Sequence, residues 1–280
     1  MTRFELEKAV KEGEILMKLD LAGSDFSGAE FAGGFFEKVS FSGCNLSGAS
    51  FRESVLINCN FTDANLSNVD FRHVCLHHCV FARASLVRAN FISAQIGETD
   101  FSGINMTDAD LTIASLANCK LTQAMLSGAN LDRTTIVQTD TTGMDLSNSN
   151  LKQTTLMKAD LSTSNLNGMS AQMVTFIEAK LSGQDLRGRS LSMCVFMGAD
   201  LSGCDFSGAT LTQCNFKDAD LTGAKLDDAK AERALFIGAK MAEASLRRAL
   251  LTQSLFVEAD LTGAIFLKAN MMQCNLMNAR

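Results

Sequence analysis

The sequence predicts an all-β solenoid, built from short extended segments that are joined by regular corners. A large apolar residue returns every five positions from Leu21 to Leu276, and a small residue lies two positions before almost every one. A period of five fits neither an α-helix nor a β-strand. Proline is absent, so no proline interrupts the pattern. The chain is therefore expected to grow along one axis as a repeat array.

The first 18 residues lie outside the repeat and are expected to form a cap. One side of a short helix ending near Gly13 can be lined by Phe4, Leu6, Ala9 and Val10. Residues 15–17, which are all apolar, would then lead into the first coil. A repeat array needs its open end covered, and this segment is placed to do so. Partner binding by the same segment is the alternative.

The five-residue register continues without a slip to the end of the pattern. Of the 52 central positions, only Thr141, Ala171 and Ala231 are not Leu, Phe, Ile or Met. Two of the small slots carry long polar side chains, Gln184 and Arg189. Because a buried unpaired arginine is costly, we expect a local distortion that lets Arg189 reach solvent.

Individual repeat units resemble those of a known family. ADLSG at 199–203, ADLTG at 219–223 and ANLDR at 129–133 are similar to the A(D/N)LXX consensus of pentapeptide repeat proteins. The resemblance covers residues 21–280. It implies a right-handed quadrilateral parallel β-helix with four pentapeptides per coil. The expected organisation is a partly helical cap at 1–18 and a β-helix at 19–280, with about 13 coils stacked into a rod on the order of 60 Å long.

In such a coil, residues 20 apart in the sequence stack on one another. This predicts three phenylalanine ladders inside the solenoid: Phe41, Phe61, Phe81 and Phe101; Phe31, Phe51, Phe71 and Phe91; and Phe176, Phe196, Phe216, Phe236 and Phe256. A row of aromatic residues can mark a ligand site, but core packing is the simpler interpretation here.

The cysteines do not suggest a disulfide scaffold. Eight of the nine occupy the small slot, at positions 44, 59, 79, 119, 194, 204, 214 and 274. There a free thiol is expected to pack as a small apolar group. Reduced cysteines favour a cytoplasmic location. The charged N-terminus resembles no signal peptide, and no apolar run approaches the length of a membrane span. With a net charge of −6, direct nucleic-acid binding is not expected.

Any specific function is expected on the outer faces, and one face carries apolar residues that flank the central position. We predict that this apolar face binds a partner protein or a second copy of the chain, as a homodimer, because such a strip exceeds what a soluble monomer usually exposes. Its members are Phe35, Val55, Ile57, Val137, Met157, Ile177, Val195, Met197, Leu235, Ile237, Leu255, Val257 and Met277.

A second face is acidic. The position before its central residue reads Asp20, Asp100, Asp140, Asp160, Asp200, Asp220 and Asp260. Family members of the MfpA and Qnr kind are understood to imitate duplex DNA and bind DNA gyrase, so the resemblance implies gyrase as a candidate partner of this acidic face. Regularly spaced carboxylates approximate a phosphate track. Asp is, however, the consensus residue at this slot, and Lys120, Lys180 and Lys240 interrupt the column.

The sequence contains no Gly-rich phosphate loop and no nucleophile elbow, and its acidic residues follow the repeat without converging on a cleft. We therefore expect no enzyme activity and no cofactor. One cluster stands apart, RHVCLHHC at 72–79, whose outward side chains are His73, Cys75, His77 and His78. Glu98 is expected to stack one coil away from His78. Ordinary surface histidines are the simpler interpretation, and a transition-metal site is the alternative.

The function predicted from these features is that of a non-catalytic scaffold for protein–protein interaction. A DNA-mimicking modulator of gyrase or another topoisomerase is the second hypothesis. A secretion-associated effector or adaptor is the third, and it rests on the family resemblance alone.

Overall fold

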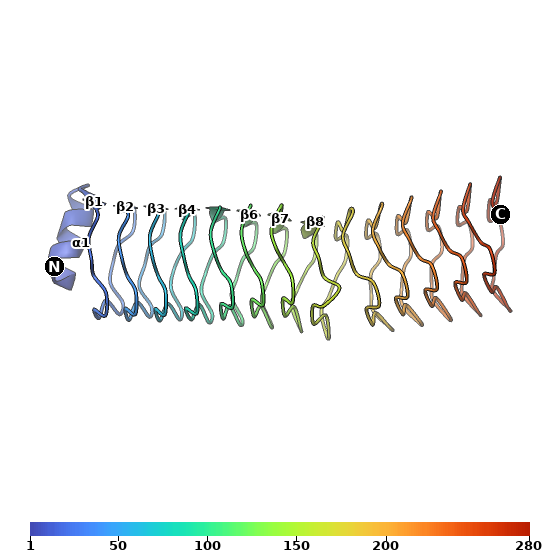
Figure 1. The fold of residues 1–280 in the computed structure, drawn as a ribbon, viewed down its shortest axis with the longest axis horizontal. Coiled ribbons are helices and arrows are strands. Elements are labelled where there is room, and N and C mark those ends of the chain that lie inside the picture. Colours follow the sequence, from blue (N-terminus) through green and yellow to red (C-terminus); the bar gives the residue numbers. More distant parts are fainter. The chain divides into compact units, whose positions relative to one another are not determined.

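The computed structural model describes residues 1–280, which form two compact units, Met1–Asn150 and Leu151–Arg280. The fold is a parallel β-solenoid with one short helix, so the predicted fold class is confirmed. Figure 1 shows α1 and the labelled strands following one another in sequence order; by their residues, β1–β7 belong to the first unit and β8 to the second. The elements are α1 Arg3–Lys11, β1 Ile15–Met17, β2 Phe35–Glu37, β3 Val55–Ile57, β4 Cys75–His77, β5 Gln95–Gly97, β6 Ser115–Ala117, β7 Thr135–Val137 and β8 Thr155–Met157.

Successive turns pair in parallel at an offset of 20 residues. Leu16 is opposite Phe36 where β1 pairs with β2. At the next faces the contact shrinks to one-residue bridges, such as Asp25 with Asn45. The backbone hydrogen bonds run between turns: Phe26 N–H donates to the Asn45 carbonyl at 2.7 Å, and Asn45 N–H donates to the Ser24 carbonyl at 3.0 Å. Each turn is therefore stabilised mainly by its neighbours.

The eight regular strands define about seven turns, which is part of the expected count of about 13 coils. The 20-residue offset continues beyond them, but in the second unit the same positions form isolated bridges, such as Thr175 with Val195 and Leu235 with Leu255. Three-residue strands are confined to the part of the chain before Lys158.

The predicted phenylalanine ladders are confirmed. In the first unit the ring centroids of Phe41, Phe61 and Phe81 follow one another at 5.0 and 4.6 Å, with nearly parallel planes. The second ladder of that unit crosses the first edge-on, for example between Phe51 and Phe61 at 6.0 Å. The second unit has one ladder, in which Phe216 and Phe236 lie 5.0 Å apart. The ladder rings that form these contacts are buried and contribute to the core.

The small slots hold polar side chains that also bond across turns, which the sequence analysis did not anticipate. The Cys44 thiol donates to the Leu21 carbonyl 23 residues earlier, at 3.0 Å, and the Ser54 hydroxyl makes the equivalent bond to Phe31. All eight slot cysteines follow this rule, at donor–acceptor distances of 2.9–3.7 Å. A slot thiol or hydroxyl therefore fills space and satisfies a buried carbonyl at once.

Helix α1 begins with a capping box, in which the Thr2 side chain and Glu5 satisfy each other's backbone N–H groups. Leu6, Ala9 and Val10 are buried, whereas Phe4 is 74% exposed. The expectation that Phe4 shares the packed side of the helix is therefore wrong. The helix is long enough for a cap and far too short to cross a membrane.

Two contacts tie α1 to the open edge of the first unit. The Arg3 guanidinium donates to the carbonyls of Ser27 and Gly28, each at 2.7 Å. The Glu7 carboxylate accepts the backbone N–H of Glu30 at 3.0 Å. These side chains satisfy backbone groups that the next turn of a solenoid would otherwise pair.

The two polar slots of the second unit are accommodated differently. The side-chain amide of Gln184 donates to three backbone carbonyls, those of Leu161, Ser162 and Ser164. Arg189 is half-buried, so part of its side chain reaches solvent as expected, but its Nε is buried without a hydrogen-bond partner.

Candidate interaction surfaces and a histidine cluster

In the first unit the apolar face is short. Phe35 pairs with Val55, and both are half-buried. Ile57 is followed one turn later by His77, so the apolar row ends there. Val137 belongs to the same face but is separated from these residues by three turns with polar or small residues. The apolar face of the first unit is therefore a small patch that extends from β1, where Ile15 and Met17 are exposed, to β3.

The apolar face of the second unit is larger. Leu235 and Leu255 pair with each other in an isolated bridge, and Ile237 and Val257 lie two residues further along the same two turns. Toward the start of the unit the row also contains Ile177, Val195 and Met197, separated from the patch by the turn that carries Asn215 and Lys217. The members are half-buried except at the two ends of the row, where Met157 and Met277 are exposed. Each side chain is partly shielded by the turns above and below.

Sequence reasoning missed several more exposed apolar residues. Met193 is 51% exposed, and Ile113, Met125 and Met173 are also exposed. Ile113, Met173 and Met193 have φ angles of 56–61°, at a corner position where glycine or asparagine is more usual. A large apolar residue at this corner position is the sequence signal that could have identified Ile113, Met173 and Met193 as exposed.

The aspartates of the acidic face have a structural role in their own turns. Asp100 Oδ1 accepts the backbone N–H of Ser102 at 2.9 Å, and Asp220 does the same for Thr222 at 3.0 Å. The remaining five predicted members make the same contact at 3.1–3.2 Å. Hydrogen bonds from the Thr142 hydroxyl and N–H hold the pKa of Asp140 below its usual range.

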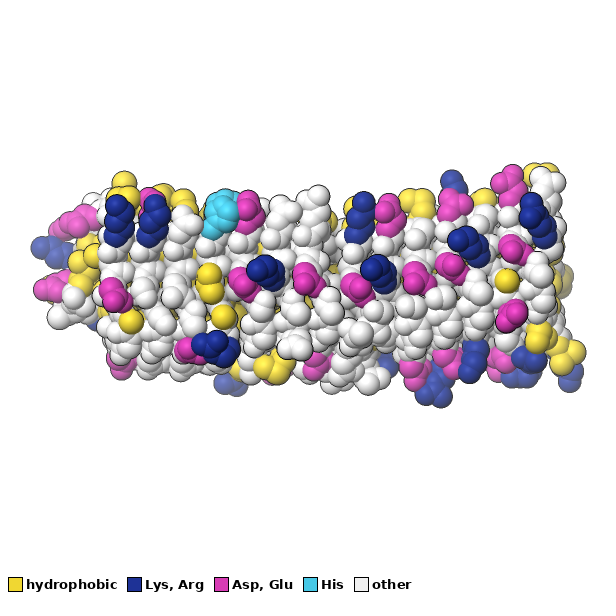
Figure 2. All heavy atoms as spheres, in the orientation of Figure 1, with side chains coloured by type: hydrophobic (Ala, Val, Ile, Leu, Met, Phe, Trp, Pro, Cys, Tyr) yellow, Lys and Arg dark blue, Asp and Glu magenta, His cyan; other side chains and the backbone are white.

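The three lysines that interrupt the acidic column pair with it. Lys120 lies 3.6 Å from Asp100 in the first unit. In the second unit Lys180 lies 3.5 Å from Asp160, and Lys240 lies 3.9 Å from Asp220. Figure 2 shows acidic and basic side chains interspersed over the visible surface. The column is therefore partly neutralised along its length.

The buried cysteines differ in acidity, since a hydrogen bond with the Cys79 thiol lowers the pKa of Cys59, whereas burial raises the pKa of other slot thiols. Burial raises the pKa of both Cys194 and Cys204 to about 12, so these thiols stay protonated at neutral pH. Cys75 on β4 is the one cysteine with an exposed side chain.

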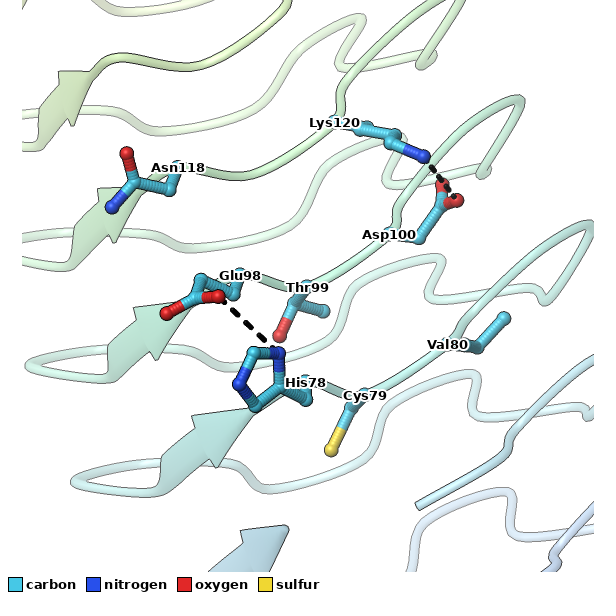
Figure 3. A pocket seen from close by; sticks show the side chains of 8 residues that line it. All are labelled: His78, Cys79, Val80, Glu98, Thr99, Asp100, Asn118 and Lys120. Atoms are coloured by element: carbon cyan, nitrogen blue, oxygen red, sulfur yellow. Dashed lines mark ion pairs between the residues drawn. The ribbon is translucent and has the colours of Figure 1, made fainter. Parts of the chain in front are cut away.

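The histidine cluster is partly assembled in the first unit. His77 ends β4, His78 follows it, and Glu98 lies one turn further. Glu98 lies 3.8 Å from His77 Nε2 and 3.4 Å from His78 Nδ1. Figure 3 shows the His78 ring and the Glu98 carboxylate pointing toward one another at one end of a shallow groove, with Lys120 and Asp100 paired at the other end.

The other two members of the predicted metal cluster do not join this group. Cys75 begins β4, two residues before His77 and on the other side of the buried Leu76 along the chain. His73 belongs to the preceding corner. The residues that the structure brings together are His77, His78 and Glu98.

Comparison with protein families agrees with the repeat pattern. A model described as a pentapeptide repeat region matches residues 34–111. A second model, described as pentapeptide repeats in eight copies, matches residues 104–140, 136–168, 176–213, 214–253 and 254–280. No curated protein sequence shows significant similarity to the chain.

Among solved structures, the chain is similar to QnrB1, a plasmid-mediated fluoroquinolone resistance protein, at 22% identity with a TM-score of 0.37. That match covers 76% of this chain and 91% of QnrB1. It is also similar to HetL, a protein involved in heterocyst differentiation regulation in the cyanobacterium Nostoc, at 21% identity with a TM-score of 0.23, covering 96% and 94% of the two chains. These likenesses concern the fold alone.

Proposed function

We propose that this chain, which belongs to the pentapeptide repeat family, is a non-catalytic protein that presents the outer faces of its β-helix to another protein. The observation that carries the proposal is the filled interior. Phenylalanine and leucine side chains occupy the core of each unit, and the slot thiols, together with hydroxyls such as that of Ser54, donate to backbone carbonyls. The side chains left to make specific contacts therefore lie on the outside.

The apolar face of the second unit is the surface we favour. Leu235, Ile237, Leu255 and Val257 form a continuous patch on two neighbouring turns. Half-buried apolar side chains on a regular backbone lose little conformational entropy on binding, which favours a flat protein partner. The partner is either another protein or a second copy of this chain.

The test removes apolar character from this face by changing Ile177, Met197, Ile237 and Val257 to Ser. The matched control changes Met173, Met193 and Leu250 to Ser, because these exposed residues flank a different face of the same unit. We expect the first variant to lose a partner captured from native lysate, or to lose self-association measured by light scattering, and the control to retain both. Circular dichroism establishes that both variants fold. Equal behaviour of the two variants would exclude the apolar face.

A DNA-mimicking modulator of gyrase is the alternative function. The 20-residue spacing of the acidic column supports it, and the paired lysines weaken it. Changing Asp200, Asp220 and Asp260 to Asn tests the idea cleanly, because an asparagine oxygen can accept the same backbone N–H, as Asn60 does from Thr62. Inhibition of gyrase supercoiling that disappears in this variant would favour mimicry. No inhibition by the wild type would exclude it.

We also propose a reducing, cytoplasm-like environment for this protein. The nine free thiols support this, since eight of them fill slots in which a carbonyl from the preceding turn is their partner.

A further inference from the structure

The backbone at the end of β4 brings two imidazoles to the same side. In an extended strand, neighbouring side chains point to opposite faces. His78 instead has a φ of 53°, in the left-handed region, and the ring centroids of His77 and His78 lie only 4.1 Å apart. Glu98 has a φ of 49° at the equivalent position of the next turn, so its carboxylate follows the same direction as His78. Two nitrogen donors and one oxygen donor therefore converge from two successive turns.

The spacing of these donors suits a tetrahedral metal ion. Glu98 Oε1 lies 3.8 Å from His77 Nε2 and Glu98 Oε2 lies 3.4 Å from His78 Nδ1, and one ligand atom from each of the three residues lies within 4.8 Å of the others. Ligands at about 2.1 Å from a zinc ion are about 3.4 Å apart when the geometry is tetrahedral. Both observed distances exceed those of an ordinary hydrogen bond. The two imidazoles and the carboxylate therefore lie close together without being hydrogen-bonded directly to one another.

The surroundings leave room for the two imidazole rings. They also place no lysine or arginine in contact with the Glu98 carboxylate. A Cβ atom at Gly97 would lie 3.1 Å from His77 Nδ1, so the glycine allows the imidazole to lie over the neighbouring turn. The nearby Lys120 is paired with Asp100 and does not contact Glu98. The only ion-pair partners of Glu98 are the two imidazoles.

We propose that His77, His78 and Glu98 bind one divalent transition-metal ion, with zinc as the physiological candidate. Imidazole nitrogen with a single carboxylate suits zinc, copper and nickel, whereas calcium and magnesium require oxygen ligands. Three protein ligands leave a position open to water or to a ligand from another molecule. Because the ligands come from the turns of β4 and β5, the ion crosslinks those two turns at the protein surface.

The test uses untagged, chelator-treated full-length protein titrated with zinc chloride in a calorimeter. We expect one zinc per chain. His77→Asn, His78→Asn and Glu98→Gln should each weaken binding by about tenfold or more, since even residues that only orient a metal ligand have effects of that size. His73→Asn and Cys75→Ser are the matched controls, and they should leave the dissociation constant unchanged. Copper should bind more tightly than zinc, and magnesium should not bind.

Two further measurements test the site even if one of the ligand variants folds poorly. Electron paramagnetic resonance of the copper-loaded wild type should show coupling to two imidazole nitrogens. Gly97→Ala keeps all three ligands but crowds the His77 ring, so it should weaken zinc binding while leaving the melting temperature of the zinc-free protein within about 2 °C. The proposal is overturned if the wild type binds no zinc, if the copper spectrum lacks two imidazole nitrogens, or if the control variants lose binding as the ligand variants do.

Discussion

The two units close the same corner of the solenoid in different ways. In the first unit each of β1–β7 is followed by an open corner, in which the backbone N–H three residues after the central position does not return to that residue's carbonyl. In the second unit, from Phe176 onward, it does. Ala179 N–H donates to the Phe176 carbonyl at 3.1 Å, and Ala199 repeats the bond with Phe196 at 3.0 Å. The open corner allows a three-residue strand, whereas the tight turn leaves a single bridge.

The two kinds of corner differ in the slot residue that lies three positions after the central residue. The open corners of the first unit carry Leu19, Val39, Cys59, Cys79, Thr99, Cys119 and Thr139. The tight turns at this corner of the second unit all carry alanine, at 179, 199, 219, 239, 259 and 279. The turn after β8 combines an alanine, Ala159, with a strand, and it is the exception.

Two of the larger slot side chains, Thr99 and Thr139, form hydrogen bonds at the corner that an alanine side chain cannot form. The Thr139 hydroxyl donates to the Val137 carbonyl at 3.0 Å and accepts the Cys119 N–H at 3.2 Å. The Thr99 hydroxyl donates to the Gly97 carbonyl at 2.9 Å. β-Branched residues also favour extended backbone. Leu19 and Val39 lack such a donor at open corners, and Ala159 also lies at an open corner, so the hydroxyls of Thr99 and Thr139 reinforce the open corner without being its sole cause. The comparison teaches that the same pentapeptide pattern supports two corner conformations.

The largest expected effect on this comparison comes from the core. Phe61 contacts four other rings, Phe41, Phe51, Phe71 and Phe81, whereas Phe236 contacts only Phe216 and Phe256. Replacing either by Ala should lower the free energy of unfolding by about 3–5 kcal/mol. The loss at Phe61 should be greater by about 1 kcal/mol or more, because two further aromatic contacts disappear. Urea unfolding followed by circular dichroism measures both variants, and equal losses would show that the units do not differ in this way.

A slot exchange tests the corner itself. Thr99→Ala removes one buried hydrogen bond and should lower the free energy of unfolding by about 1 kcal/mol. It should also convert the corner to a tight turn, so that the amide of residue 99 becomes protected from hydrogen exchange. Ala199→Thr should have the opposite effect on the amide of residue 199. If both amides keep their original protection, the slot residue does not decide the corner.

Acid titration should separate two kinds of ion pair. Hydrogen bonds from the Arg187 side chain lower the pKa of Asp185 to about 2 within one turn of the second unit. In the first unit, Arg83 lowers the pKa of Asp63 from an adjacent turn. Because an unfolded aspartate titrates near 3.9, each pair contributes stability that is complete above about pH 4 and is lost as pH falls toward the folded pKa.

Carboxyl NMR titration measures these midpoints directly. Arg187→Gln should raise the midpoint of Asp185 and leave that of Asp63 in place, and Arg83→Gln should do the reverse. Since both carboxylates are largely exposed, the effect on stability should be small. An unchanged midpoint for Asp185 in the Arg187 variant would contradict the assignment.

The smallest effect on stability is expected at Cys75. It is the one exposed thiol, whereas the slot thiols are shielded and, for Cys194 and Cys204, have raised pKa values. In native protein a thiol reagent should modify Cys75 rapidly and the others slowly, with Cys274 next because it is only half-buried. Cys75→Ser should remove the fast phase without shifting the melting temperature. A second fast thiol in this variant would show that one of the units opens locally.

The sequence by itself determined the solenoid, its core positions and the phenylalanine ladders, because a strict five-residue period can bury the residues at Phe61 and Phe216 in only one way. It also placed Glu98 beside His78, since residues 20 apart stack. Only the tertiary structure decided the closure of each corner, the half-burial of Ile237 and Val257, and the choice of His77 over His73 and Cys75. These depend on the left-handed backbone at single corner positions and on contacts between adjacent turns, and neither is visible in a periodic pattern of side-chain types.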